Sequence, residues 1–352
     1  MTAELKPNIR TLSKQELADY FTGIGEPLYR AGQVYEWLWK KQARSFSEMT
    51  NLSKKIREGL DYNFTFNAAR INTVQQSSDG TRKFSFLLFD NNIIEGVLIP
   101  SGSRVTACIS SQVGCNLACS FCATGRLGFK RNLIFDEMYD QVGLINSWSL
   151  KENNQALTHI VYMGMGEPLL NYQNVLKSVE IIGSEEGMAM SPQRITVSTV
   201  GIAKMIRQLG KDKARFNLAV SLHSANDVKR NEIIPFNKQD SLKDLIEALV
   251  YFHRETKKRI TVEYIMLKEF NDTIEDAKDL AAFCKNFPVK INLIQYNPVD
   301  GVPFADSGRI RTTAFKEFLE SKNIVVNLRH SRGLDIDAAC GQLAANIKPI
   351  NS

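Results

Sequence analysis

The stretch that decides the fold is residues 104–125, which read RVTACISSQVGCNLACSFCATG. It opens with a strand-like run, and the loop that follows carries Cys115, Cys119 and Cys122 at the spacing C-x3-C-x2-C. Zinc sites usually use paired C-x2-C knuckles and four ligands, whereas this local set stops at three. Cysteine thiolates also hold iron–sulfur clusters, and three ligands on a four-iron cluster leave one iron open for a substrate. The spacing therefore predicts an iron–sulfur site; a structural zinc site, or buried free cysteines, is the alternative.

Strand-like and helical patterns alternate from this stretch to about residue 330. Strand-like runs lie at 157–163, 194–200, 216–222, 259–267, 289–296 and 324–328. Repeated βα units predict parallel strands joined by right-handed crossovers. Six or so units are fewer than a closed eightfold barrel needs. We therefore expect an α/β fold, a partial (β/α)6 barrel, with its chemistry at the carboxyl ends of the strands.

Toward the N-terminus the pattern changes twice. We expect a helical accessory domain at 1–65, a β-hairpin extension at 66–103, and a core with a C-terminal cysteine loop at 104–352. In the first part Ser13 and Glu16 have the spacing of a capping box, which predicts the start of a helix. The aromatic and basic residues of this part suit a module that faces nucleic acid, and a small core built from the same aromatics is the alternative. Further helices are predicted at 30–41 and 53–60, and strands at 83–89 and 93–99.

The composition is that of an ordinary globular protein. Of 352 residues, 43% are hydrophobic and 23% charged, which excludes a disordered or low-complexity chain. The chain has no apolar window of about 18 residues or more, and residues 1–10 lack a signal-peptide pattern. We therefore expect a cytoplasmic protein without a membrane partner. The net charge of +6 permits an anionic partner such as nucleic acid without requiring one.

Polar residues and glycines follow several of the predicted strands. Met163-Gly-Met-Gly166-Glu167-Pro168 comes after the first of them; its glycines let the backbone approach a ligand, and Glu167 can accept hydrogen bonds from an ammonium group. Each such residue alone is an ordinary strand-end residue. Their shared position at the carboxyl ends of successive strands is what predicts a binding site. The other members are Ser198, Ser221, Leu222, His223 and Asn297.

The cysteine loop resembles the signature of radical S-adenosylmethionine (SAM) enzymes, C-x3-C-x-Φ-C, in which the aromatic Φ is Phe121 here. The resemblance implies a [4Fe-4S] cluster on the three loop cysteines, whose open iron binds SAM and whose electron yields a 5′-deoxyadenosyl radical. Gly166-Glu167-Pro168 looks like the family's Gly-Glu-Pro motif, which holds the SAM amino group. By the same resemblance, the SAM site is lined by Ser198, Ser221, Leu222, His223 and Asn297.

Two cysteines outside the loop, Cys108 and Cys340, extend the resemblance to one branch of that superfamily. A lone cysteine is usually a small buried hydrophobe, and we expect that role for Cys284. The chain resembles the RNA adenine methyltransferases of the RlmN and Cfr type over nearly its whole length, from the N-terminal segment 29–37 through 109–115 and 163–171 to the Cys340 tail. The resemblance implies a SAM-dependent methyltransferase acting on C2 of adenine. Its implied targets are the peptidyl-transferase centre of 23S rRNA and the position next to the anticodon in tRNA.

The chemistry of that branch accounts for the two extra cysteines. Because C2 of adenine is electrophilic, it cannot serve as the nucleophile of ordinary methyl transfer. The resemblance implies a ping-pong route with two SAM molecules per turnover: one methylates Cys340, and the second yields the radical that activates this S-methyl group for addition to adenine. Cys108 then attacks the Cys340 sulfur, which releases methylated RNA and leaves a disulfide to be reduced.

Glu95 is an acidic residue inside an apolar strand, where the family places its acceptor for the ring proton. Burial can raise the pKa of a carboxyl group and tune it as a base. A solvent-facing strand glutamate is the alternative.

The implied partners are 23S rRNA, tRNA and an electron donor such as flavodoxin or ferredoxin with its reductase, and we expect a monomer. Arg126, Lys130 and Arg131 follow the cysteine loop and can neutralise RNA phosphates, whereas the basic run 253–259 is more simply a solvated face. Three alternatives stay open. They are methylation at C8, as in the Cfr type; a radical SAM enzyme that does not methylate and does not need Cys340; and a non-enzymatic RNA-binding protein with a structural zinc.

Overall fold

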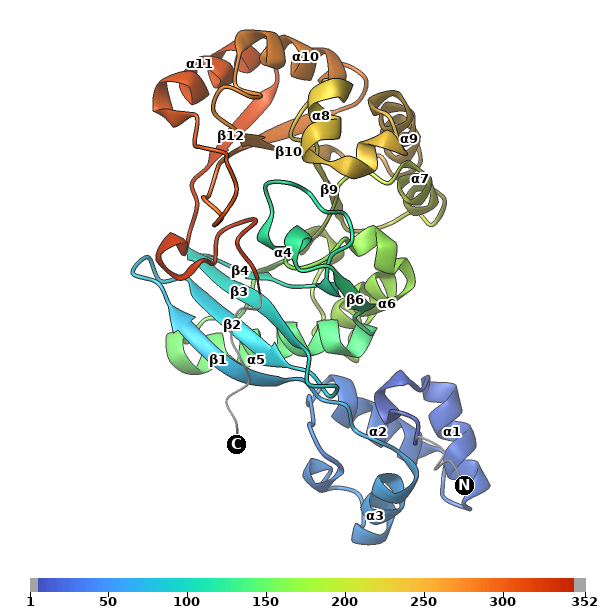
Figure 1. Cartoon of the computed structure of the whole chain (residues 1–352). Coiled ribbons are helices and arrows are strands. Elements are labelled where there is room, and N and C mark those ends of the chain that lie inside the picture. Colours follow the sequence, from blue (N-terminus) through green and yellow to red (C-terminus); the bar gives the residue numbers. More distant parts are fainter. Residues whose placement is uncertain (1–5, 345–352) are drawn as a thin grey trace.

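The computed structural model describes residues 6–344 and is organised around one ten-stranded sheet (Figure 1). The first strands pair antiparallel, and from β4 onward neighbouring strands pair parallel. The antiparallel strands are β1 (Arg70–Gln76), β2 (Arg82–Leu87) and β3 (Ile93–Ser101). The parallel strands are β4 (Arg104–Cys108), β7 (His159–Tyr162), β8 (Ile195–Thr199), β9 (Asn217–Ser221), β10 (Ile260–Met266), β11 (Val289–Gln295) and β12 (Val325–Arg329). Within residues 6–344, β12 pairs only with β11, so the barrel stays open and the predicted partial barrel is confirmed.

Helices lie along the outer side of the curved sheet (Figure 1). Their spacing of apolar residues explains this position: α9 (Leu242–Thr256) buries Leu242, Leu245, Leu249 and Phe252, which recur every three or four residues on one face. The other helices of the barrel are α5 (Phe135–Asn153), α6 (Tyr172–Gly183), α7 (Ala203–Lys211), α8 (Asp227–Ile233), α10 (Ile274–Cys284) and α11 (Gly308–Glu320). The inner side of the sheet is thereby left for the site.

The extension at 66–103 is continuous with the barrel sheet, because β3 pairs with β4 along the register Val97–Cys108 to Ser101–Arg104. Two parts of the β-structure, three strands in all, escaped the sequence prediction. One is β1, whose residues are polar and mostly exposed and so lack an apolar alternation. The other is a small hairpin of β5 (Gln112–Gly114) and β6 (Phe129–Asn132), which flanks the cysteine loop and forms a sheet of its own.

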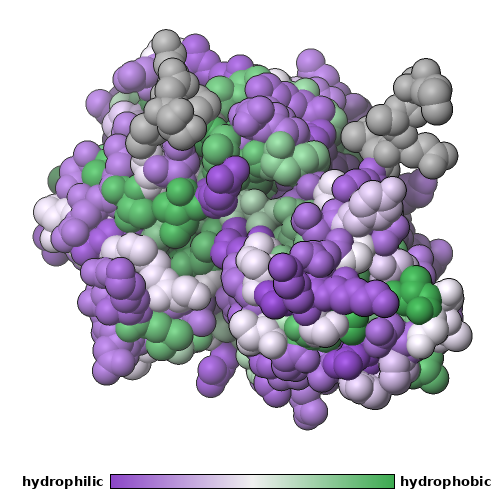
Figure 2. All heavy atoms as spheres, turned by 90° about the horizontal axis from the view of Figure 1, so that it is seen from below, coloured by the Kyte–Doolittle hydropathy of each residue, from purple (hydrophilic) through white to green (hydrophobic). Residues whose placement is uncertain are grey.

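The N-terminal helices α1 (Lys14–Gly23), α2 (Tyr29–Trp39) and α3 (Lys54–Asn63) form a unit beside the sheet (Figure 1). The predicted capping box is confirmed, since the Ser13 hydroxyl accepts from the Glu16 N–H and the Glu16 carboxylate accepts from the Ser13 N–H. The aromatic residues have divided roles. Trp39 is buried and packs edge-on against Tyr139 of α5, whereas Tyr29 and Tyr62 are 58% and 77% exposed. Figure 2, which views the molecule from this side, shows hydrophilic residues over most of the face.

Candidate active site

A cavity of about 560 Å³ opens at the carboxyl ends of the parallel strands and contains most of the predicted site. Five of the six cysteines line it: Cys108, Cys115, Cys119, Cys122 and Cys340. Cys284 is buried in α10 and does not line it, as expected for a core cysteine. The sequence places these thiols up to 232 positions apart (340 − 108), so their convergence is a property of the fold.

The cysteine loop is held tightly by its own backbone. The Cys115 N–H donates to the Gly128 carbonyl at 2.9 Å, and Gly114 has φ +76° with so little space that a Cβ there would lie 1.8 Å from the same oxygen. Only glycine fits such a position without displacing the neighbouring strand. The loop therefore presents its three thiols from a fixed turn. The short helix α4 (Ala123–Arg126) follows at once.

The surroundings of the three loop thiols disfavour their ionisation unless a positive charge lies beside them. Burial and the charges of neighbouring groups raise the pKa of Cys115 to about 11 and raise the pKa values of Cys119 and Cys122 as well. A mononuclear site needs its ligand atoms within about 2.0–2.3 Å of one point. Within residues 6–344, no three His, Cys, Asp or Glu side chains are arranged to hold a single ion. In an iron–sulfur cluster, by contrast, each cysteine binds a different iron, and cysteine thiolates are the usual ligands of such clusters.

Glu167 and Gly166 lie at the end of β7. The Glu167 carboxylate is buried and accepts from the N–H groups of Leu169 and Val200, both at 2.9 Å. Burial raises its pKa to about 7 despite these hydrogen bonds. Gly166 has φ +99°, and a Cβ there would lie 2.5 Å from the Gln112 Cβ. Both residues line the cavity, with Glu167 tying the ends of β7 and β8 together.

The predicted strand-end residues divide into two groups. Ser198 and Ser221 lie side by side at the ends of β8 and β9, with their hydroxyl oxygens 3.2 Å apart, and both line the cavity. His223 also lines it, and burial lowers its pKa to about 3, so the imidazole is neutral and accepts from the Ile265 N–H. Leu222 is fully buried in the core and does not line the cavity, nor does Asn297, whose amide donates to the Cys340 carbonyl at 3.1 Å.

Cys108 and Cys340 differ sharply in exposure. Cys108 ends β4, and burial raises the pKa of its thiol to about 12. Cys340 is exposed and lies in an irregular segment after β12. Glu95 of β3 is buried rather than solvent-facing, although it does not line the cavity. Its carboxylate accepts from the Ala344 N–H at 2.9 Å and lies 3.7 Å from the Lys83 ammonium.

Arg329 is a cavity residue that the sequence analysis missed. It ends β12, and its guanidinium donates to Glu263 at 3.3 Å. Burial alone would lower its pKa, but the nearby Cys340 and Glu263 outweigh burial and raise it. The signal was present, because the basic residues Arg329, His330 and Arg332 follow a predicted strand just as the polar residues of the other strands do.

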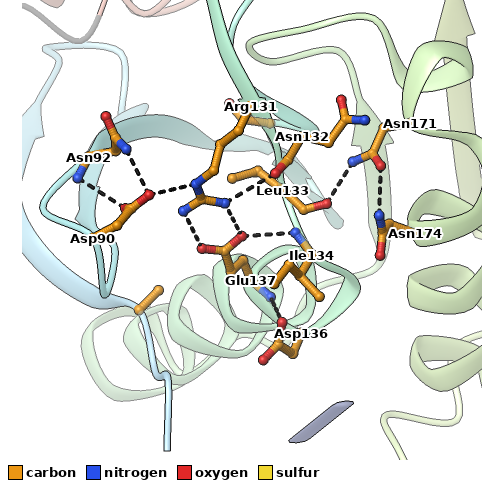
Figure 3. A network of polar contacts seen from close by, with 12 residues as sticks. Asp90, Asn92, Arg131, Asn132, Leu133, Ile134, Asp136, Glu137, Asn171 and Asn174 are labelled. Carbon is orange, nitrogen blue, oxygen red and sulfur yellow. Dashed lines mark hydrogen bonds and ion pairs between the residues drawn. The ribbon is translucent and has the colours of Figure 1, made fainter. Parts of the chain in front are cut away.

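Arg131, which we expected to neutralise RNA phosphates, is engaged in ion pairs within the protein. Its guanidinium donates to Asp90 at 2.6 Å and to both Glu137 oxygens at 2.8 Å, as Figure 3 shows. Burial would lower its pKa, but these carboxylates outweigh burial and raise it. Arg131 therefore joins the β2–β3 turn to the start of α5. Arg126 donates to the Asp300 carbonyl and Lys130 to the Asn92 side chain, and both stay exposed.

The open barrel and the three-cysteine loop define the class. Residues 109–283 match the model of the radical SAM superfamily, and residues 7–65 match the model of the ribosomal RNA large subunit methyltransferase N-terminal domain. Among solved structures, a radical SAM methyltransferase from Sphaerobacter thermophilus aligns with a TM-score of 0.91 and 38% identity, covering 97% of this chain and 100% of the other. The protein is thus a radical SAM enzyme.

Curated relatives narrow the class to one family. A probable dual-specificity RNA methyltransferase RlmN from Cytophaga hutchinsonii is 55% identical over 96% of this chain and 93% of its own length. A dual-specificity RNA methyltransferase RlmN from Nitratidesulfovibrio vulgaris is 44% identical over 96% and 95%. The chain belongs to the RlmN family of radical SAM methyltransferases, which confirms the predicted family and enzyme class. No helix in residues 6–344 is long and apolar enough to cross a membrane.

Proposed function

We propose that this protein methylates C2 of adenine, both in the peptidyl-transferase centre of 23S rRNA and next to the anticodon of tRNA. Relatives named as dual-specificity RNA methyltransferases support two kinds of RNA substrate. The observation that carries the proposal is that Cys108 and Cys340 open onto the same cavity as the three loop cysteines. A radical SAM enzyme that does not methylate needs only the loop cysteines, so the additional pair favours methyl transfer.

Cys115, Cys119 and Cys122 would hold a [4Fe-4S] cluster, and one turnover would use two SAM molecules. When bound, these groups supply the methyl group and the one-electron chemistry. The donor set supports this assignment, since three buried or partly buried thiols with raised pKa values ionise readily only beside a strong cation. Glu167, Ser198 and Ser221 offer polar atoms along the same cavity for the amino acid and ribose parts of SAM.

Cys340 is the residue that we propose to carry the methyl group. Its thiolate attacks the methyl carbon of SAM, so that an S–C bond forms as the sulfonium–methyl bond breaks. Exposure suits Cys340 for this role, whereas the buried Cys108, with its pKa raised to about 12, is protonated at neutral pH. The two cysteines therefore have distinct reactivities in the same cavity.

Glu95 is proposed to accept the ring proton, and Cys108 to release the product. The Cys108 thiol loses its proton and attacks the Cys340 sulfur, forming an S–S bond while the bond from that sulfur to the adenine-bearing carbon breaks. The carbon leaves with the electron pair and takes up the proton that Cys108 gave up. Two electrons then reduce the disulfide. The burial of Glu95 and its hydrogen bond from Ala344, four residues after Cys340, support a place beside the reacting segment.

The remaining parts of the proposal concern partners. We infer a monomer in the cytoplasm, reduced by flavodoxin or ferredoxin with its reductase. Arg104, Arg329 and Arg332 line the cavity and supply positive charge for an RNA backbone.

The proposal is tested by mass spectrometry of nucleosides from 23S rRNA and tRNA of a deletion strain. We expect 2-methyladenosine to be absent from both RNAs, restored by the wild-type gene and not restored by Cys340→Ala. Loss of 8-methyladenosine instead would move the regiochemistry to C8 and keep the mechanism. An unchanged content of both nucleosides would refute the substrate assignment.

A further inference from the structure

Residues 333–344, here called the strap, carry Cys340 and have little regular structure of their own. The only helical turn in them is η6 (Leu334–Ile336). Five of the strap residues line the cavity, namely Ala338, Ala339, Cys340, Gly341 and Leu343. A segment without a hydrogen-bonded ladder takes its position from contacts with the rest of the molecule. Those contacts therefore decide where the Cys340 sulfur lies.

Two aspartates join the start of the strap to the β1–β2 turn. One lies in the turn and accepts from the strap, and the other lies in the strap and accepts from the turn. Asp79 of the turn accepts from the Gly333 N–H of the strap at 2.9 Å. Asp335 of the strap accepts from the Ser77 hydroxyl at 2.5 Å and the Ser78 N–H at 3.0 Å, both in the turn. Each segment thus provides one carboxylate acceptor and donates hydrogen bonds to the carboxylate of the other segment. Charge-assisted hydrogen bonds of this kind are stronger than neutral ones.

At Gly333 the backbone of the strap packs tightly against the β1–β2 turn. Gly333 has φ +67°, and a Cβ there would lie 2.7 Å from the Ala338 Cβ and 2.9 Å from the Thr81 Cγ2. The strap therefore contacts both the turn and itself at Gly333. Asp79 remains ionised in this setting, because the N–H groups of Thr81 and Gly333 outweigh burial and lower its pKa to about 2.

The rest of the strap is joined to the cysteine loop and to the extension. The Ala123 N–H donates to the Gly341 carbonyl at 2.7 Å, and the Thr124 hydroxyl donates to the Leu343 carbonyl at 2.6 Å. Lys83 of β2 donates to the Asp337 carbonyl at 3.4 Å. Cys340 consequently lies between the paired aspartates on one side and the cysteine loop on the other.

We propose that Asp79 and Asp335 are positioning residues, which clamp the start of the strap to the β1–β2 turn and so hold Cys340 at the cavity for methyl transfer. The inference rests on the proposed role of Cys340. The extension thereby gains a function in the reaction, as the platform on which the methyl-carrying segment is anchored. Neither aspartate lines the cavity, so both act through the strap and not on the substrate.

The test uses the full chain with its cluster, in the double variant Asp79→Ala/Asp335→Ala and the single variant Asp335→Asn. Asp337→Asn is the matched control, because it removes a strap carboxylate two residues away for which the structure describes no hydrogen bond. Hydrogen exchange of peptides covering 333–344 reports the position of the strap independently of activity. The ratio of methyl groups transferred to SAM cleaved reports its effect on the reaction.

We expect strap amides to exchange at least tenfold faster in the double variant, and the methylation-to-cleavage ratio to fall at least tenfold while SAM cleavage stays within threefold. Asp335→Asn should shift both quantities in the same direction by less, and Asp337→Asn should stay within twofold of the wild type. If the double variant does not fold, the comparison of Asp335→Asn with the control Asp337→Asn decides. Equal exchange rates and ratios in Asp335→Asn and Asp337→Asn would overturn the clamp. Methylation by Cys340→Ala would instead overturn the proposed function, and the exchange rates would still judge the clamp.

Discussion

Replacing Arg10 with alanine tests the junction between the helical unit and the barrel. The Arg10 guanidinium is buried between the two parts and donates to both oxygens of Asp140 in α5, each at 2.7 Å. It also lies 5.2 Å from the centre of the Trp39 ring. Removing it leaves a carboxylate that is only 6% exposed, with the Ala69 N–H at 2.8 Å and the Arg44 guanidinium at 3.9 Å as its remaining partners.

The expected cost follows from this arrangement. Breaking a buried ion pair by removing one partner destabilises a protein by about 3–5 kcal/mol. Because Arg44 stays within 3.9 Å of Asp140, we expect the lower end, about 3 kcal/mol, which is a factor of about 100 in an opening equilibrium. Amides of α1 and α2 should therefore exchange about 100-fold faster with solvent, whereas amides of β8 and β9 should be unchanged.

Hydrogen exchange followed by peptide mass spectrometry measures both sets of amides in one experiment. Lys14→Ala is the matched control, because its partner Glu186 and Lys14 itself are 50% and 55% exposed and such pairs contribute about 0–1 kcal/mol. The double replacement Arg10→Met/Asp140→Leu should recover part of the protection, since it removes the unpaired Asp140 carboxylate, although the Ala69 N–H then loses its acceptor. Protection in Arg10→Ala equal to that in Lys14→Ala would refute the reasoning.

Three further predictions concern the cysteine loop and the start of α5. Gly114→Ala should lower the iron content per chain at least threefold relative to Gly128→Ala. Both glycines have positive φ, but only at Gly114 would a Cβ meet a carbonyl oxygen. Equal iron contents in the two variants would contradict this prediction. Burial raises the folded-state pKa of Asp136 from 3.8 to about 6, so the native state binds the extra proton and stability should fall as pH rises from about 4 to 6, by up to about 3 kcal/mol. Urea unfolding across that range should lose this slope in Asp136→Asn, and an unchanged slope would contradict the assignment. Arg131→Ala leaves the buried Glu137 unpaired and should lower the free energy of unfolding by about 2–3 kcal/mol, whereas Lys130→Ala should change it by less than about 0.5 kcal/mol; similar unfolding midpoints would exclude the network of Figure 3 as a source of stability.

The features that could be predicted are those written locally in the chain. The three loop cysteines lie within eight residues, and their spacing predicted an iron–sulfur site. Each parallel strand has its own apolar run, which predicted the fold, whereas the class followed from the resemblance to a known family. The features that could not be predicted depend on distant partners. One of the two carboxylate partners of Arg131, Asp90, lies 41 residues away on the β2–β3 turn, and the sequence did not indicate this contact.

The same limit applies inside the site. Asn297 contacts Cys340 of the strap, 43 residues away, and Glu95 contacts Ala344, 249 residues away. The periodicity of the sequence gives no sign of such contacts. Strand β1 was missed because its mostly polar residues do not show the alternation of a strand. Its pairing with β2 is what fixes its extended structure.

The contacts of the strap have a consequence for the order of assembly. Those with the extension join residues 249 to 258 positions apart, so none of these can form until the strap itself has been synthesised. Strands β4 to β11 and the cysteine loop are complete earlier, and domains generally fold as synthesis proceeds from the N-terminus. During translation the three loop thiols are thus presented in a cavity that still lacks one wall. For the cluster proposed on these thiols, this interval would give iron and sulfide their widest access to the cavity, before the strap covers it.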